Sequence, residues 1–283
     1  MTVKITCLVD NAAQQASPFW GEHGFSALIE TEEGRLLFDT GQSGTVLLHN
    51  LRAVGLAPSQ VDALALSHAH YDHSAGLPMF LQNWFAAFSS PSKKLALYAN
   101  ADLFRERFSR RDEGLKNIGF GLSREILSRY VDLRLSDEPQ QILPGVYTTG
   151  RIQGRSEPEG RSPRHLVREG EQWIADPYRD DMSLVLQVEQ GLVLVCGCCH
   201  AGLLNTLHHV RGAFPGQITA ILGGTHLECM DDGQMQHIVQ VLREYGSPRL
   251  YLNHCTGQRA YVALATALGD RVHPCPSGTI LTL

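Results

Sequence analysis

The sequence lacks any apolar run long enough to cross a membrane as a helix. None of its stretches approaches the ~20 consecutive apolar residues that a transmembrane helix needs. Residues 1–7 include a short β-branched run but no basic leader followed by an apolar segment, so no signal peptide is predicted. We therefore expect no membrane partner.

Cysteine is present, but not in the pattern of a secreted disulfide framework. The chain has seven cysteines, an odd number, and three of them crowd into residues 196–199. A disulfide framework would be spread along the chain and even in count. Reduced thiols fit a reducing compartment better, so the expected location is the cytoplasm.

The chain also lacks a large excess of charge of one sign. Its formal net charge is −5, which argues against a nucleic-acid-binding surface. The apolar fraction of 43% is ordinary for a globular protein and allows a substantial core. The expected partner is a small-molecule substrate, and a homo-oligomer remains an open alternative to a monomer.

Apolar runs and turn residues predict a mixed α/β fold. Residues 25–30 and 35–39 form a hairpin pattern, and residues 100–130 are predicted to form two amphipathic helices. Further strands are predicted at residues 3–9, 61–67, 95–99, 183–188, 192–196, 217–222, 249–253 and 279–283, and helices at 43–54, 76–88, 201–211, 233–245 and 258–268. Early hairpins followed by strand–helix alternation indicate mixed sheets covered by helices.

Residues 150–182 differ from the rest of the chain. They are rich in Arg, Glu, Gly and Pro and show little apolar periodicity, so they are predicted to form a long surface insertion in a single domain of residues 1–283. A loop this long in a compact domain is usually functional or disordered. Its arginines either bind phosphate, whose geometry guanidinium matches, or are neutralised by acidic residues of the same segment.

The most informative motif is the run from His68 to His73, which reads HAHYDH and directly follows the predicted strand 61–67. Four of its six residues are metal-ligand types. The carboxyl end of a strand is where α/β folds place ligands, and a tight loop can aim His68 and His70 one way and Asp72 and His73 another. Imidazole and carboxylate suit zinc, iron or manganese and do not resemble a calcium cage. The alternative is an exposed polar loop, against which the density of ligand types argues.

Residues 25–78 resemble the N-terminal half of the metallo-β-lactamase superfamily. They combine a hairpin, the segment Phe38-Asp39-Thr40-Gly41, a helix, a strand and HxHxDH. The resemblance implies an αββα sandwich of two mixed β-sheets flanked by helices, with a one- or two-metal site at the sheet edge. It also implies that His68 and His70 bind the first metal and that Asp72 and His73 bind the second. Asp39 would support the site from behind, or it is a plain strand-end turn.

Three histidines of the C-terminal half follow apolar strands in the same way. His200, His226 and His254 lie in the motifs GCCHAG, GGTHL and NHCTG. We expect His200 and His254 to be metal ligands, whereas His226 is either a ligand or a group that supports the site or contacts substrate. His165 is a weaker ligand candidate, and the remaining histidines, His23 among them, are expected to have no special role.

Motifs along nearly the whole chain resemble one branch of that superfamily. They are VDN at residues 9–11, HGFS at 23–26, and the three histidine motifs named above. The branch is typified by the archaeal dihydropterin–ribofuranosylaminobenzene 5′-phosphate synthase. One position departs from the superfamily, because most members have a bridging Asp where this chain has Gly197-Cys198-Cys199. Cys198 either takes that ligand position as a thiolate or is a buried thiol.

The resemblance implies a metal-dependent hydrolase that acts on a small anionic or phosphorylated metabolite. Two divalent metal ions are expected, with zinc first and Mn, Fe or Mg as alternatives. They would lower the pKa of a shared water from about 16 towards ~7 and produce the attacking hydroxide. Asp72 would orient the nucleophile, and His226 would stabilise an oxyanion or protonate the leaving group. The alternatives are an iron-dependent redox or oxygenase enzyme on the same fold and a non-catalytic metal or redox sensor.

Overall fold

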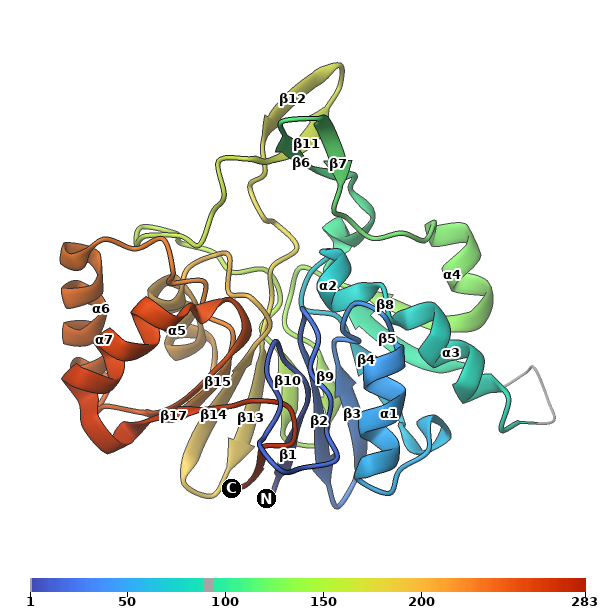
Figure 1. Ribbon diagram of the computed structural model, residues 1–283, viewed down its shortest axis with the longest axis horizontal. Coiled ribbons are helices and arrows are strands. Elements are labelled where there is room, and N and C mark those ends of the chain that lie inside the picture. The colour runs from blue at the N-terminus through green and yellow to red at the C-terminus, as the bar shows by residue number, and fades with distance from the viewer. Residues whose placement is uncertain (1, 89–93) are drawn as a thin grey trace.

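The computed structural model describes residues 2–88 and 94–283. Two seven-stranded sheets lie face to face, and helices cover the outer face of each sheet (Figure 1). Both termini lie at the same end of this sandwich. The predicted αββα architecture of two mixed sheets flanked by helices is therefore confirmed.

The first sheet has the strand order β18-β1-β2-β3-β4-β5-β8. Its strands are β1 (Lys4–Val9), β2 (Ser26–Thr31), β3 (Gly34–Phe38), β4 (Ala63–Ala65), β5 (Leu95–Ala99), β8 (Val131–Leu135) and β18 (Ile280–Thr282). The helices α1 (Thr45–Ala53), α3 (Leu77–Phe85) and α4 (Arg124–Tyr130) cover its outer face. Strands β3, β4, β5 and β8 run parallel, so their carboxyl ends lie at one edge.

The second sheet has the strand order β17-β16-β15-β14-β13-β10-β9. Its strands are β9 (Gln141–Leu143), β10 (Val146–Thr148), β13 (Leu184–Val188), β14 (Gly191–Cys196), β15 (Ile218–Gly223), β16 (Arg249–Leu252) and β17 (Val272–Pro274). Helices α5 (Leu203–Ala213), α6 (Asp232–Glu244) and α7 (Gln258–Leu268) cover it. Strands β14 to β17 are parallel, so this sheet also gathers carboxyl ends at one edge.

Burial on both faces explains why the central strands read as unbroken apolar runs. Leu28 and Leu37 pack in the core under α1 and α3, whereas Ile29 and Leu36 pack in the core between the two sheets. Successive side chains of a strand point to opposite faces, so a strand buried on both sides is apolar at every position.

The remaining helical elements are short. They are α2 (Tyr71–Ser74) and the 3₁₀ turns η1 (Pro58–Gln60), η2 (Ala101–Phe104), η3 (His254–Thr256) and η4 (Gly269–Arg271). Across the part of the chain that the structure describes, no helix has the length and apolarity needed to traverse a bilayer.

A third, four-stranded antiparallel sheet stands above the sandwich (Figure 1). Its order is β12-β11-β6-β7, with β6 (Arg107–Arg111), β7 (Gly114–Asn117), β11 (His165–Glu169) and β12 (Gln172–Ala175). Two predictions are therefore wrong. Residues 100–130 contain one α-helix, α4, and a hairpin instead of two helices, and residues 150–182, predicted to be a long surface loop, contain strands β11 and β12.

The cause of both errors lies in the composition of this sheet. Arg107 and Ser109 are buried with Phe108 between them on the other face, so the two-residue period is real but is carried by polar residues. Gly114, the first residue of β7 after the hairpin turn, has a φ of 123°, which favours glycine. Strand β6 pairs with β11, which lies far along the chain, so no local window reveals the pairing.

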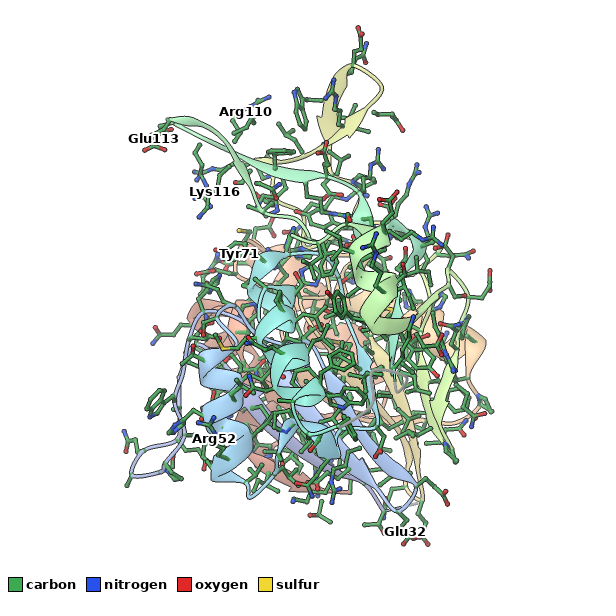
Figure 2. The ribbon with its side chains drawn as sticks, turned by 90° about the vertical axis from the view of Figure 1, so that its right-hand side faces the viewer. Glu32, Arg52, Tyr71, Arg110, Glu113 and Lys116 are labelled. Atoms are coloured by element: carbon green, nitrogen blue, oxygen red, sulfur yellow. The ribbon has the colours of Figure 1, made fainter. Side chains whose placement is uncertain are left out.

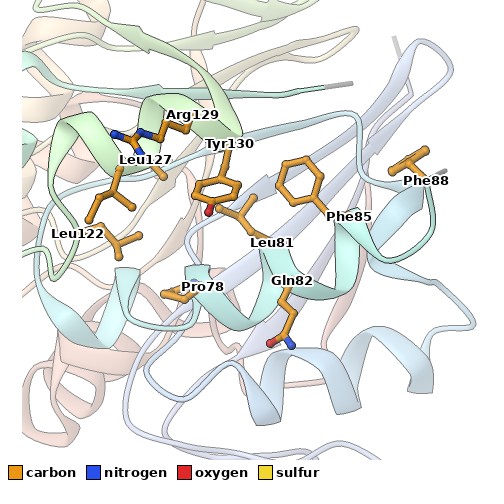
Figure 3. A pocket seen from close by; sticks show the side chains of 10 residues that line it. Pro78, Leu81, Gln82, Phe85, Phe88, Leu122, Leu127, Arg129 and Tyr130 are labelled. Carbon is orange, nitrogen blue, oxygen red and sulfur yellow. The ribbon is translucent and has the colours of Figure 1, made fainter. Parts of the chain in front are cut away.

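An apolar cavity of about 660 Å³ lies between α3 and α4 (Figure 3). Leu81 and Phe85 line it from α3, and Leu127 and Tyr130 line it from α4. None of the predicted ligand residues lines it. The chemistry is therefore to be found at the sheet edges.

Candidate metal centre

Four loops that follow parallel strands meet at one edge of the sandwich. Residues 67–73 follow β4, residues 197–200 follow β14, residues 224–226 follow β15 and residues 253–255 follow β16. The carboxyl ends of parallel strands share an edge, so these junctions bring histidines from both halves of the chain together.

His68, His70 and His200 form one cluster. Their ring centroids are 4.6 to 5.0 Å apart, and one ligand atom from each lies within 4.8 Å of the others. The Nε2 atoms of all three rings are buried and have no hydrogen-bond partner among the described residues. Burial, together with the charges of neighbouring histidines, holds the pKa of His68 and of His200 well below its usual range. Neutral imidazole, the form that binds metals, is therefore favoured.

The hydrogen bonds behind these rings leave the Nε2 lone pairs free. A carboxylate only accepts hydrogen bonds, so the Ser67 hydroxyl donates its proton to Asp39 Oδ2 at 2.6 Å. Ser67 Oγ therefore accepts from His68 Nδ1, which lies at 2.8 Å. The carbonyl of Gly160 accepts from His200 Nδ1 at 2.7 Å. This network assigns the proton to Nδ1 in both rings and turns Nε2 towards the cluster.

Asp72, His73 and His254 form a second cluster beside the first. Asp72 Oδ2 lies 3.7 Å from His73 Nε2 and 3.4 Å from His254 Nε2, and the two Nε2 atoms are 3.1 Å apart. Burial acts against charge on His254, but the hydrogen bond to Asp72 and the negative charges of Cys255 and Asp72 raise the pKa of His254 to about 9. The surroundings of His254 therefore favour a positive charge, which either a proton or a bound cation can supply.

Residues of the N-terminal half hold the second cluster from behind. Asp39 Oδ2 accepts from His73 Nδ1 at 2.7 Å, as expected of a supporting carboxylate. Asn11 Oδ1 faces His254 Nδ1 at 3.1 Å, and Asp10 accepts from the backbone N–H of His254 at 2.7 Å. The VDN motif thus fixes both the ring and the backbone of His254, a role that its sequence did not reveal.

The model of the metallo-beta-lactamase superfamily matches residues 20–197, more than half of the chain. The chain belongs to the metallo-beta-lactamase superfamily. Its N-terminal hairpin, the HxHxDH loop and strand β14 all fall within the matched region.

Individual relatives cover nearly the whole chain. A protein of Methanocaldococcus jannaschii named 7,8-dihydropterin-6-methyl-4-(beta-D-ribofuranosyl)-aminobenzene-5'-phosphate synthase is 28% identical over 91% of this chain and 89% of its own length. A second, uncharacterised protein of the same archaeon is 30% identical over 92% of this chain and 93% of its own length. The resemblance to the branch typified by that synthase is therefore confirmed.

Solved structures agree with the fold. Tm1679, described as a metal-dependent hydrolase of the beta-lactamase superfamily, matches with a TM-score of 0.83 and 25% identity over 99% of each chain. The metallo-beta-lactamase fold protein YhfI from Bacillus subtilis matches with a TM-score of 0.61 and 14% identity over 100% of this chain and 99% of its own.

Cys198, for which the resemblance implies the place of a bridging Asp, lies between the two clusters. Its Sγ is 3.1 Å from His73 Nε2 and lies within 4.8 Å of ligand atoms of His68, His200 and His254. Burial and the neighbouring Cys255 raise the pKa of the Cys198 thiol well above its usual range. The position suits a bridging ligand, and whether the thiolate binds a cation stays a prediction.

Cys255 is a site residue that the sequence analysis missed. Its Sγ lies within 4.8 Å of ligand atoms of Cys198 and His254, although the sequence predicts no role for it beyond its place in the HCTG motif. Burial acts against the thiolate, but hydrogen bonds with Cys198 and His226 hold the pKa of Cys255 well below its usual range. Its place directly after a predicted ligand was the signal available in the sequence.

His226 lies at the side of the first cluster. Its ring centroid is 4.4 Å from that of His200, and its backbone is held in the left-handed region at φ 49°. Burial acts against its charged form, but hydrogen bonding to Cys255 and the charge of that residue raise the pKa of His226. It is thus near enough to ligate, and a contact with substrate stays a prediction.

The Arg-rich segment 150–182 covers the centre. The ring of Tyr178 stacks on His200 at 4.2 Å, and His165 stands 5.1 Å from His70. One further contact passes through the backbone, since Asp181 accepts from the N–H of Ala201, next to His200, at 2.7 Å. Tyr178 and Asp181 were missed because nothing local distinguishes them from other residues of a polar loop.

His23 lies at the second cluster, contrary to the expectation that it has no special role. Its Nε2 lies 3.3 Å from Asp72 Oδ2, and it forms a potential ligand group with Asp72 and His254. It sits in the HGFS motif next to Gly24, whose φ of 138° lets its backbone pass close to the carbonyl of Asp72. Only this tertiary contact brings it to the site.

Proposed function

We propose that this protein is a metal-dependent hydrolase that holds two divalent cations and acts on a small anionic or phosphorylated metabolite. One observation carries the proposal. The Nε2 atoms of His68, His70 and His200 are buried close together without partners among the described residues. A buried polar atom without a partner is costly, and a transition-metal ion would satisfy all three at once.

The second cation would be held by Asp72, His73 and His254, with Cys198 between the two positions. Imidazole, carboxylate and thiolate together favour zinc, and the thiolate makes magnesium the least suitable of Mn, Fe and Mg. The supporting bonds from Asp39 and Asn11 hold two of these rings in the orientation that ligation requires.

A divalent cation held here would lower the pKa of water towards ~7 and polarise a substrate oxygen. Asp72 stands beside the ligand atoms of the second cluster and would orient the attacking water and hold its proton. The His226 ring lies 4.4 Å from the His200 ring and would stabilise an oxyanion or protonate the leaving group. Tyr178 and His165 cover the first cluster and would limit the access of bulk water.

Two further considerations support an anionic substrate. The name of the archaeal synthase includes a 5'-phosphate, and strands β6 and β7 of the third sheet carry Arg110, Arg111 and Lys116. The cytoplasmic location and the absence of nucleic-acid and membrane partners stay predictions from the sequence, as does the question of a homo-oligomer.

An iron-dependent redox enzyme is the second candidate. The observation that favours it is the pair of thiols, Cys198 and Cys255, at ligand distance in the same site as the histidines. Thiolate ligands stabilise iron as well as zinc. A metal sensor is the third reading, because the same donors would hold a regulatory ion.

Metal analysis of the purified protein, combined with turnover, tests the proposal. Two equivalents of zinc or manganese with phosphodiesterase or esterase activity would support the hydrolase. Bound iron together with substrate-dependent oxygen consumption would reject the hydrolase and support the iron-dependent redox enzyme. Tightly held metal without turnover of any ester, lactone or phosphodiester would favour the sensor.

A further inference from the structure

The four-stranded sheet turns one face towards the metal centre. In its register, Lys116 of β7 lies opposite Ser109 of β6, and Ser109 lies opposite His165 of β11. Residues paired across strands project from the same face. The His165 ring stands 5.1 Å from the His70 ring, so this face points at the predicted ligands.

Two cationic side chains belong to that face. Lys116 is part of the row just described, and Arg111 follows Ser109 by two residues on β6, so it projects on the same side. Lys116 Nζ lies 5.3 Å from the ring centroid of Tyr71, which stands between two predicted ligands. Figure 2 shows Lys116 on the Tyr71 side of the hairpin and Arg110 on the opposite side.

These two cations are not neutralised. The arginines of segment 150–182 that were candidates for phosphate binding include Arg155 and Arg161, and both pair with Glu159. By contrast, within residues 2–88 and 94–283 no ion pair joins Arg111 or Lys116 to an acidic side chain. Two unpaired cations that face a cation-binding centre repel its charge, and a bound anion would relieve that repulsion.

We propose that Arg111 and Lys116 form an anion subsite that holds a phosphate monoester group of the substrate while the reacting bond lies at the histidine clusters. The inference rests on the proposed function, because it names the part of the substrate that does not react. A guanidinium binds two oxygens of a phosphate side by side, and an ammonium adds a mobile point charge. The two residues would thus determine specificity without taking part in the reaction.

The probe is 4-carboxybenzylphosphonate, whose carboxylate can bind at the metals and whose P–C bond resists hydrolysis. Its dissociation constant for the zinc-loaded protein is compared by calorimetry with that of 4-methylbenzoate, which lacks the phosphonate. Arg111→Ala and Lys116→Ala are each expected to weaken phosphonate binding about fivefold to tenfold, the size of one charge-assisted contact at a partly exposed position, and to leave 4-methylbenzoate unchanged. Lys116→Arg should restore most of the affinity.

Arg110→Ala is the matched control, because Arg110 is adjacent on the same strand but projects from the opposite face. Equal losses in Arg110→Ala and Arg111→Ala would show a diffuse charge effect and overturn the subsite, as would unchanged phosphonate affinity in the Arg111 and Lys116 variants. Zinc content and thermal midpoint are measured for every variant. If the protein binds the phosphonate through Arg111 and Lys116 but shows no hydrolytic turnover, the anion subsite is supported and only the proposed hydrolase function is rejected.

Discussion

Arg107 and Asp180 form a buried ion pair that connects the four-stranded sheet to the predicted metal-binding loop. Arg107 Nη2 lies 2.7 Å from Asp180 Oδ1, and Asp180 Oδ2 accepts from the backbone N–H of Ala69 at 2.8 Å. Ala69 lies between His68 and His70. The sheet that covers the centre therefore also holds the loop that carries the first two predicted ligands.

Arg107→Met should destabilise the protein strongly. Arg107 also pairs with Asp102 and Asp176, so the variant leaves the buried carboxylates of Asp176 and Asp180 without their cation, whereas Asp102 keeps Arg105 at 4.0 Å. Breaking such a buried network typically costs about 3–5 kcal/mol of unfolding free energy. Urea denaturation measures the loss. Arg134→Met, which removes the exposed pair with Asp132, is the control and should cost no more than about 1 kcal/mol. Similar losses in the two variants would contradict the importance of burial.

The loss of unfolding free energy in Arg107→Met should also depend on pH. Burial raises the pKa of Asp176 and of Asp180 above the 3.8 of a free aspartate, against the charge of Arg107. A carboxyl whose pKa is higher in the folded state than in the unfolded state contributes most to the free energy of unfolding below pH 3.8. That contribution is lost as the pH rises through the pKa of the folded state. Without Arg107 these pKa values rise further, so the loss of unfolding free energy is expected to grow as the pH rises above 3.8. A deficit independent of pH would contradict this account.

Asp72→Ala should abolish turnover and lower metal content while the fold persists. The carboxylate faces His73, His254 and His23, and its loss removes both a predicted ligand and the group that would hold the proton of the attacking water. Metal analysis, circular dichroism and assays with a chromogenic phosphodiester check the three parts. His208→Ala, on helix α5, is the control and should keep full metal content. Unchanged turnover in Asp72→Ala would refute its role.

Cys198→Ser should change the electronic environment of the metals, because Cys198 lies between the clusters. In the cobalt-substituted protein we expect a thiolate-to-cobalt charge-transfer band in the near ultraviolet that this variant loses. Cys229→Ser, which alters an exposed thiol, should keep the band. A band that survives in Cys198→Ser and disappears in Cys255→Ser would assign the ligand to Cys255 instead.

Asn11→Ala should weaken metal binding without removing any ligand. Asn11 Oδ1 orients the His254 ring, and loss of such a supporting partner typically costs about 10- to 100-fold in metal affinity. Competition with a chelator measures the affinity. Asn83→Ala, which removes only a bond to the backbone of α3, is expected to behave as the unaltered protein. Equal chelator resistance of the two variants would show that Asn11 does not position His254.

The sequence by itself determined the layers of the sandwich and the residues that meet at its edge. Strands buried on both faces are predicted by the consecutive apolar residues Leu28 and Ile29 and Leu36 and Leu37. The run HAHYDH predicts metal ligands, because four donor residues lie within six positions. Both signals are local, because period and spacing can be read within one short window.

Tertiary structure alone decided which distant residues complete the site. His23 and Tyr178 reach it through contacts between segments far apart in the chain, and the polar hairpin of Arg111 and Lys116 covers it through pairing of β6 with β11. Such contacts leave no periodic trace, because pairing partners far apart in sequence are chosen by the packing of the whole chain and not by local preference.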